Sequence, residues 1–107
     1  MIKKLELSKI RQKLVSRFSP QRIILFGSQA RGSSDIHSDV DILIISPIKG
    51  KRRDLMVKID RSLDKFNYAF DIVVLTEEEF DRDRFIPGTL ARYAYKEGRI
   101  LYETKRK

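Results

Sequence analysis

Residues 22–32 read RIILFGSQARG and residues 38–45 read SDVDILII, and these two stretches decide the fold of the chain. Each contains a short, almost wholly aliphatic run, which is typical of a β-strand buried on both faces. The loop between the two runs, residues 27–38, is small and polar, with two glycines and four serines. The pattern predicts two buried strands, over 22–26 and 40–45, joined by a loop that a ligand can approach closely.

Further elements can be assigned on both sides of these strands. Apolar residues at helical spacing predict three helices, which span residues 3–18, 51–66 and 86–102, the last interrupted at Gly98. An aliphatic run over 69–75 predicts a third strand. Thr76 and Glu79 have the spacing of a capping box, which predicts a short helix after that strand. This order of elements predicts an α/β (α+β) fold in which helices cover a small sheet.

Length and composition restrict the class of protein. A chain of 107 residues, 41% of them apolar, can bury one core, so we expect a single domain over residues 1–107 with a basic tail at about 103–107. The absence of cysteine excludes a disulfide scaffold and a thiolate metal site. No apolar run is long enough to cross a membrane, and no signal-peptide pattern opens the sequence. We therefore expect a cytoplasmic protein with no membrane partner.

The charge balance is strongly basic, because 23 Lys and Arg face 15 Asp and Glu and leave a net charge of +8. A basic surface attracts phosphate, so nucleic acid is one candidate partner. Charged residues that only solvate helices, or adaptation to hot growth, explain the same composition. The sequence has no aromatic RNA-binding signature, zinc-finger spacing or helix-turn-helix pattern. Charge alone leaves the partner open.

The most informative residues are aspartates in strands that otherwise have a buried pattern. Asp39 and Asp41 are two residues apart at the start of the second strand, so their side chains are expected on one face. Asp71 holds the equivalent place near the start of the third strand. Aspartate is rare in strands and is almost never buried without a partner. If the two strands are neighbours, three carboxylates converge.

Converging carboxylates need to be neutralised. Two like charges about 4 Å apart repel by roughly 4 kcal/mol at an effective dielectric of 20. Oxygen ligands without His or Cys suit Mg²⁺ or Mn²⁺, so Asp39, Asp41 and Asp71 are candidate metal ligands. In the alternative interpretation, each aspartate pairs with an arginine or caps a strand end. That alternative explains one aspartate better than it explains three.

The polar loop supplies a second candidate site. Gly27 lets the backbone come close to a ligand, and the amides that follow can open a helical turn suited to phosphate. Ser28 adds a hydroxyl donor. A glycine-serine pair after a strand is usually only a turn, but here ten residues separate it from Asp39 in a fixed pattern.

These residues resemble the signature of the minimal nucleotidyltransferases in the polymerase-beta-like superfamily. That signature is a strand, then Gly-Ser-x-Ala-Arg-Gly, then Ser-Asp-x-Asp followed by aliphatic residues, with a third carboxylate on a later strand. The chain has GSQARG at 27–32, SDVDILI at 38–44 and FDIVV at 70–74. The resemblance covers about residues 20–102 and implies the family's fold, a small mixed sheet covered by helices.

The resemblance also implies a role for each motif residue. Asp39 and Asp41 would ligate two divalent ions, Mg²⁺ or Mn²⁺ in its place, and Asp71 would ligate one of them. Gly27 and Ser28 would hold the β- and γ-phosphates of a nucleoside triphosphate, with ATP favoured. Two metals about 3.5–4 Å apart stabilise both the attacking and the leaving oxygen of an in-line displacement. The reaction would place a nucleoside monophosphate on an acceptor hydroxyl and release pyrophosphate.

Two other residues of the loop have less defined roles. Arg31 belongs to the motif and is a candidate nucleotide-binding residue, whose guanidinium would contact a phosphate or one of the aspartates. In the alternative interpretation, Arg31 forms an ion pair that only orders the loop. His37 is the single histidine and, with Ile36, stands where relatives often have a proline and an acid. We interpret it as a solvent-exposed loop residue rather than as a base or a ligand.

The resemblance suggests a partner as well. Minimal family members are often encoded beside a small helical HEPN-domain protein, a ribonuclease-like toxin, and act as its antitoxin by adenylylating it or by binding it. Larger relatives have an additional domain for the base or the acceptor, so we expect the acceptor site to come from a HEPN partner or a homodimer. Two alternatives remain: a binding module that masks a partner without catalysis, and an RNA-directed nucleotidyltransferase, which the charge of +8 would favour.

Overall fold

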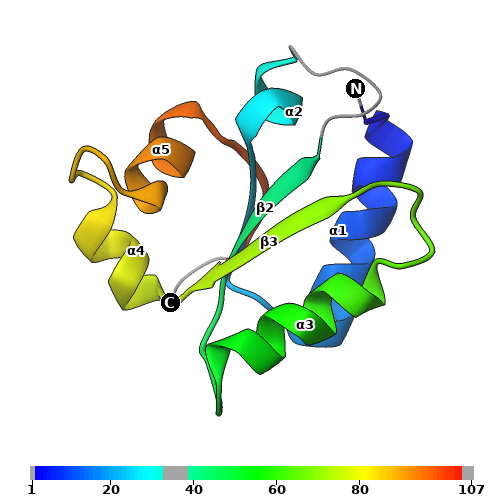
Figure 1. The fold of residues 1–107 in the computed structure, drawn as a ribbon, viewed down its shortest axis with the longest axis horizontal. Coiled ribbons are helices and arrows are strands. Elements are labelled where there is room, and N and C mark those ends of the chain that lie inside the picture. The colour runs from blue at the N-terminus through cyan, green and yellow to red at the C-terminus, as the bar shows by residue number, and fades with distance from the viewer. Residues whose placement is uncertain (1, 33–38, 105–107) are drawn as a thin grey trace.

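A four-stranded mixed sheet forms the centre of the computed structural model, which describes residues 2–32 and 39–104 (Figure 1). The strands are β1 (Arg22–Phe26), β2 (Val40–Ile45), β3 (Phe70–Leu75) and β4 (Arg99–Glu103). Their order across the sheet is β3-β2-β1-β4. β2 and β3 run parallel, whereas β1 is antiparallel to both of its neighbours. The sheet confirms the predicted fold class.

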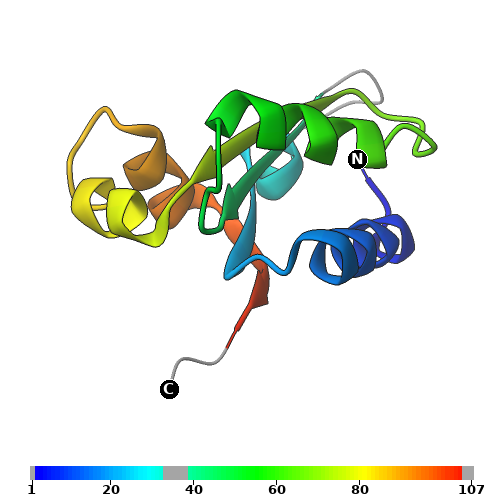
Figure 2. The same cartoon turned by 90° about the horizontal axis from the view of Figure 1, so that it is seen from below.

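Helices cover both faces of this sheet (Figures 1 and 2). The longer helices α1 (Lys4–Phe18) and α3 (Arg52–Ser62) lie on one side, and α4 (Glu77–Asp83) and α5 (Leu90–Glu97) lie on the other. The short helix α2 (Gly27–Arg31) follows β1 directly. Among these described helices, none is long and apolar enough to cross a membrane.

Two separate cores arise because side chains alternate along each strand. Ile42 and Ile44 of β2 pack in the core under α1 and α3. Leu43 and Ile45 of the same strand pack in the core under α4 and α5. All four are fully buried, which explains why the strand is aliphatic throughout. The same alternation decides which face each aspartate occupies.

The prediction of one broken helix over residues 86–102 is wrong at its C-terminal end. The helix is limited to α5, and the chain after Gly98 forms β4, which pairs with β1. β4 is only partly buried, with 61% of Ile100 exposed, so its sequence has no clear buried-strand pattern. Its structure depends on pairing with a distant strand rather than on local preference.

The second predicted helix, over residues 51–66, is also shorter in the structure, because α3 ends at Ser62. Its apolar pattern still holds beyond that end, since Leu63 and Phe66 pack on the same core through successive turns. The Phe66 N–H donates to the Leu63 carbonyl at 3.0 Å. Apolar spacing therefore identified the buried face correctly but not the end of the helix.

The capping box predicted before α4 is present. The Thr76 hydroxyl accepts from the Glu79 N–H at 3.2 Å, and Glu79 Oε1 accepts from the Thr76 N–H at 2.8 Å. The second oxygen of Glu79 lies 2.7 Å from a guanidinium nitrogen of Arg52, at the start of α3. Arg52 also donates to the Val74 carbonyl in β3. This cluster connects helices on opposite faces around the end of the sheet.

We expect Glu79→Gln to lower the free energy of unfolding by about 1 kcal/mol at neutral pH. Glutamine can still accept from Thr76, so the substitution removes mainly the ion pair. Hydrogen bonding from Arg52 and from the Thr76 backbone lowers the pKa of Glu79 from 4.5 to about 2. The ionised carboxylate therefore stabilises the fold above pH 4.5, and this contribution is lost as the pH falls towards 2.

Denaturant unfolding of both proteins at several pH values measures this difference. Glu78→Gln is the matched control, because it removes the same charge from the same helical turn at an exposed position. Equal stability losses in the two variants, or a difference that persists unchanged at pH 2, would show that the Arg52 pair contributes nothing specific.

Candidate active site

Asp41 and Asp71 are brought side by side at one end of the sheet. β2 and β3 are parallel neighbours, and their register places Asp41 opposite Asp71. By strand alternation, Asp41 shares a face with Leu43, and Asp71 shares that face with Val73. Both carboxylates therefore belong to the side that α4 and α5 cover, close to the N-terminal ends of their strands.

Asp39 is placed differently from the other two aspartates. It directly precedes β2 and is exposed, next to residues 33–38, which lie outside the described part of the chain. Within residues 2–32 and 39–104, no three His, Cys, Asp or Glu side chains lie close enough together to hold one metal ion. The aspartates thus share one end of the sheet without closing into a ligand set, and the metal role stays a prediction.

The electrostatics of Asp41 nevertheless suit a cation. Partial burial raises the pKa of Asp41, and the neighbouring Asp71 and Asp39 carboxylates raise it further, whereas the Arg31 guanidinium opposes them. Like charges at this position repel one another in a medium less polar than water. Carboxylate oxygens with excess negative charge are the ligands that Mg²⁺ and Mn²⁺ prefer. The residues present therefore fit a hard divalent ion.

Gly27 lies directly against the Asp41 carboxylate. The last residue of β1, Phe26, pairs with Asp41, so the chain turns into α2 immediately beside it. Gly27 has φ of +73°, and a Cβ built there would lie 2.1 Å from Asp41 Oδ2. Only glycine fits this position without displacing the carboxylate. The turn thereby brings Gly27 and the half-buried Ser28 to the edge of the aspartate pair.

Side chains from distant parts of the sequence hold α2 in place. Gln29 is buried, and its Oε1 accepts from the Ile2 N–H at 2.9 Å. Arg31 donates to the Tyr93 hydroxyl in α5. The Tyr93 ring packs edge-to-face on Phe26 at a centroid distance of 6.1 Å. Sequence reasoning did not predict a role for Tyr93, because 62 residues separate it from Arg31 and no local pattern links them.

A groove of about 460 Å³ lies beside Tyr93. It is lined by the loop before α5, residues 87–89, and by the side chains Arg92, Lys96 and Glu97 on the helix. Tyr93 links this groove to the predicted site, because it also accepts the hydrogen bond from Arg31, and α5 covers the face of the sheet that carries Asp41. Ile36, His37 and Ser38 of the loop lie outside the described part of the chain.

Comparison with known proteins assigns the class of protein that this fold and site define. The pattern of the nucleotidyltransferase domain matches residues 7–105. The chain belongs to this family, and it is a nucleotidyltransferase.

Individual relatives agree with this assignment. The chain is 37% identical over 83 residues to MJ0604 of Methanocaldococcus jannaschii, assigned as a protein adenylyltransferase, covering 77% of this chain and 78% of the relative. A crystal structure from Sulfolobus solfataricus, assigned as a nucleotidyltransferase, superposes on the chain with a TM-score of 0.62 at 28% identity. The superposition covers 92% of this chain and 79% of the other. A chain from a toxin–antitoxin crystal structure with AMP-PNP superposes with a TM-score of 0.64 at 26% identity. That superposition covers 92% of this chain and 74% of the other.

Proposed function

We propose that this nucleotidyltransferase moves AMP from ATP to a hydroxyl group of a partner protein, using divalent metal ions. The observation that carries the proposal is the placement of Asp41 opposite Asp71, with the Gly27 turn packed against the Asp41 carboxylate. This arrangement is suited to a metal-bound triphosphate. The carboxylate pair can bind the metal ions, and the glycine, which has no Cβ, lets the phosphates come close to the backbone.

Each motif residue has a defined role in this proposal. Asp39, Asp41 and Asp71 would hold two Mg²⁺ ions, with Mn²⁺ as a substitute, and the ions would neutralise charge on the attacking and leaving oxygens. Gly27 and Ser28 would bind the terminal phosphates. Arg31, held by Tyr93, would meet a phosphate oxygen with its charged guanidinium. Catalysis by these side chains would consist of positioning and charge compensation.

The choice of nucleotide and acceptor is supported by the relatives. MJ0604 is assigned as a protein adenylyltransferase, and a similar chain was solved in a toxin–antitoxin structure with AMP-PNP. We therefore propose an adenine nucleotide as donor and a HEPN-domain toxin as the favoured acceptor, with a second copy of the chain as the other candidate. The groove beside Tyr93 is a suitable place for the acceptor segment, since Tyr93 also holds Arg31 of the motif loop.

The test is incubation with ATP labelled on the α-phosphate, Mg²⁺, and either a cognate partner protein or RNA. Label on the partner is the expected result. Tight binding of the partner without label would favour a masking module, and lengthened RNA would favour an RNA-directed transferase. Omitting the metal, or adding a chelator, should abolish labelling and tests the metal requirement in the same assay.

Tyr93→Phe is expected to reduce the rate of transfer about tenfold, because Arg31 loses the hydroxyl that holds it. The phenylalanine ring can keep the edge-to-face contact with Phe26, so the melting temperature should stay close to that of the original protein. Tyr95→Phe is the matched control in the same helix, on a ring that packs instead on Phe80 and Phe85. Equal rates in the two variants would remove Tyr93 from the positioning of Arg31.

A further inference from the structure

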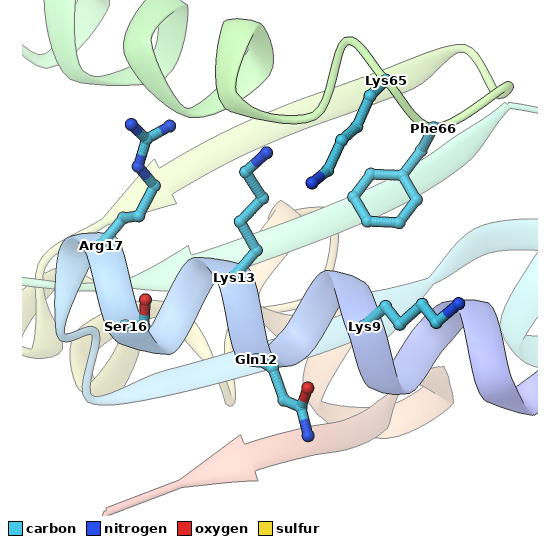
Figure 3. A pocket seen from close by; sticks show the side chains of 7 residues that line it. All are labelled: Lys9, Gln12, Lys13, Ser16, Arg17, Lys65 and Phe66. Atoms are coloured by element: carbon cyan, nitrogen blue, oxygen red, sulfur yellow. The ribbon is translucent and has the colours of Figure 1, made fainter.

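The side of the molecule opposite the aspartates carries a basic groove. A cavity of about 730 Å³ opens between α1 and the turn after α3 (Figure 3). Arg17 also lines a second cavity, of about 380 Å³, between the C-terminal halves of α1 and α3. The two together contain six cationic side chains: Lys9, Lys13, Arg17, Lys58, Arg61 and Lys65.

The cations form two facing rows. Lys9, Lys13 and Arg17 are four residues apart along α1, so they lie on one stripe of the helix and span about 12 Å. The opposite row comes from α3 and the turn that follows it. Figure 3 shows Lys13 and Lys65 pointing toward one another across the groove, with Arg17 directed the same way as Lys13. The rows therefore concentrate positive charge along a line rather than at a point.

No ion pair between described residues neutralises these cations, although Asp64 lies near Lys13. The ion pairs among the described residues join Arg22, Arg52, Arg82 and Arg84 to their carboxylates, and none includes a cation of the groove. Partial burial and the nearby Lys65 and Arg17 charges lower the pKa of Lys13, although Asp64 raises it. In the described part of the chain, no carboxylate lines either cavity. A fold that holds like charges together in this way is stabilised by an anion.

The remaining lining groups indicate what kind of anion fits. Gln12 and Ser16 are neutral groups that can donate hydrogen bonds, and the half-buried rings of Phe66 and Phe18 provide apolar surface. A cationic groove that follows a backbone, with aromatic rings on which bases stack, is the general solution for single-stranded nucleic acid. Protein interfaces are instead depleted in lysine at their centres. Three of the six cations here are lysines that surround a single cavity.

We propose that the groove between α1 and α3 binds the phosphate backbone of single-stranded nucleic acid, at a site separate from the aspartates. The groove accommodates a few consecutive phosphates between the two rows of cations. A base stacks on the part of the half-buried Phe66 ring that remains accessible. The site lies on the α1 and α3 face, whereas Asp41 and Asp71 belong to the other face. The bound strand is therefore held away from the reacting groups, and binding requires neither metal nor nucleotide.

Fluorescence anisotropy with a labelled oligouridine tests the proposal on the full chain, without ATP or metal. We expect binding that weakens with salt, and about tenfold weaker binding in Lys13→Gln/Lys65→Gln. The slope of log affinity against log salt should decrease by about 1.4 in that variant, because each lost phosphate contact removes about 0.7. Phe66→Leu should weaken binding at least severalfold, with a smaller change of the salt slope.

Lys49→Gln/Lys51→Gln is the matched control, because it removes the same charge from exposed positions before α3. Equal weakening in both double variants would overturn the proposal in favour of diffuse attraction. Absence of binding at low salt would overturn it directly, and so would equal competition by polyglutamate, which would identify an acidic polypeptide as the ligand. Asp41→Asn should bind the oligonucleotide as the original protein does, so this test is independent of the proposed transfer activity.

Discussion

Asp41→Asn should reduce nucleotidyl transfer by about 1,000-fold or more and leave the protein folded. If Asp41 ligates the metal ions, its loss removes several kcal/mol of charge stabilisation in the transition state, and each 1.36 kcal/mol corresponds to a tenfold change in rate. Asparagine has nearly the same shape, so the packing around β2 should not change. Transfer of labelled AMP in the presence of Mg²⁺ is the measurement.

The stability of the same variant provides an independent readout. Burial and the Asp71 and Asp39 carboxylates raise the pKa of Asp41, so its ionised form costs more free energy in the folded protein than in the unfolded chain. Removing that charge is expected to leave the free energy of unfolding unchanged or to increase it. A residue that only held the fold together would show the opposite, with activity and stability lost together.

Asp54→Asn is the matched control, because Asp54 is exposed in the first turn of α3, away from the aspartate pair. It should retain full activity. If Asp41→Asn also retained activity, the proposed metal-binding role of Asp41 would be wrong. The nucleotidyltransferase family itself would stand, because it rests on the match over residues 7–105.

Features encoded in neighbouring residues could be predicted from the sequence. The strand over 40–45 and the Thr76–Glu79 capping box have the predicted bounds, because aliphatic runs and cap spacing act within a few residues. The equivalent places of Asp41 and Asp71, each near the start of an aliphatic run, could also be predicted, and their register follows once β2 and β3 are parallel neighbours. Each part of the predicted motif is therefore encoded in neighbouring residues, and the fold has only to place the strands that carry Asp41 and Asp71 side by side.

Features that depend on long-range pairing could not be predicted. β4 forms because β1 offers an open edge, and its own residues are too exposed to have a strand pattern. The bond between Arg31 and Tyr93 depends on how α5 packs beside α2, which no spacing in the sequence specifies. The basic groove likewise needs α1 and α3 to lie together, although its charges were visible as an excess of lysine and arginine.

Gly27→Ala should reduce transfer about 100-fold, although no functional group of a side chain is removed. The Cβ that alanine introduces would lie 2.1 Å from Asp41 Oδ2, so the carboxylate or the turn must move. A displacement of about 1 Å in a catalytic group is enough for a rate loss of that size. Because Gly27 also has φ of +73°, alanine should lower the free energy of unfolding by about 1–2 kcal/mol.

Gly50→Ala separates these two effects. Gly50 has φ of +76°, almost the same backbone conformation, but a Cβ there meets nothing within 4 Å. Both variants should therefore lose stability through backbone strain, Gly27→Ala at least as much as Gly50→Ala, whereas only Gly27→Ala should lose activity. Parallel measurement of unfolding and of AMP transfer gives both quantities for each variant. If the two variants lost activity equally, backbone strain alone would explain the effect. If neither did, the contact between Gly27 and the Asp41 carboxylate would have no part in the reaction, and the glycine would serve only the turn that joins β1 to α2.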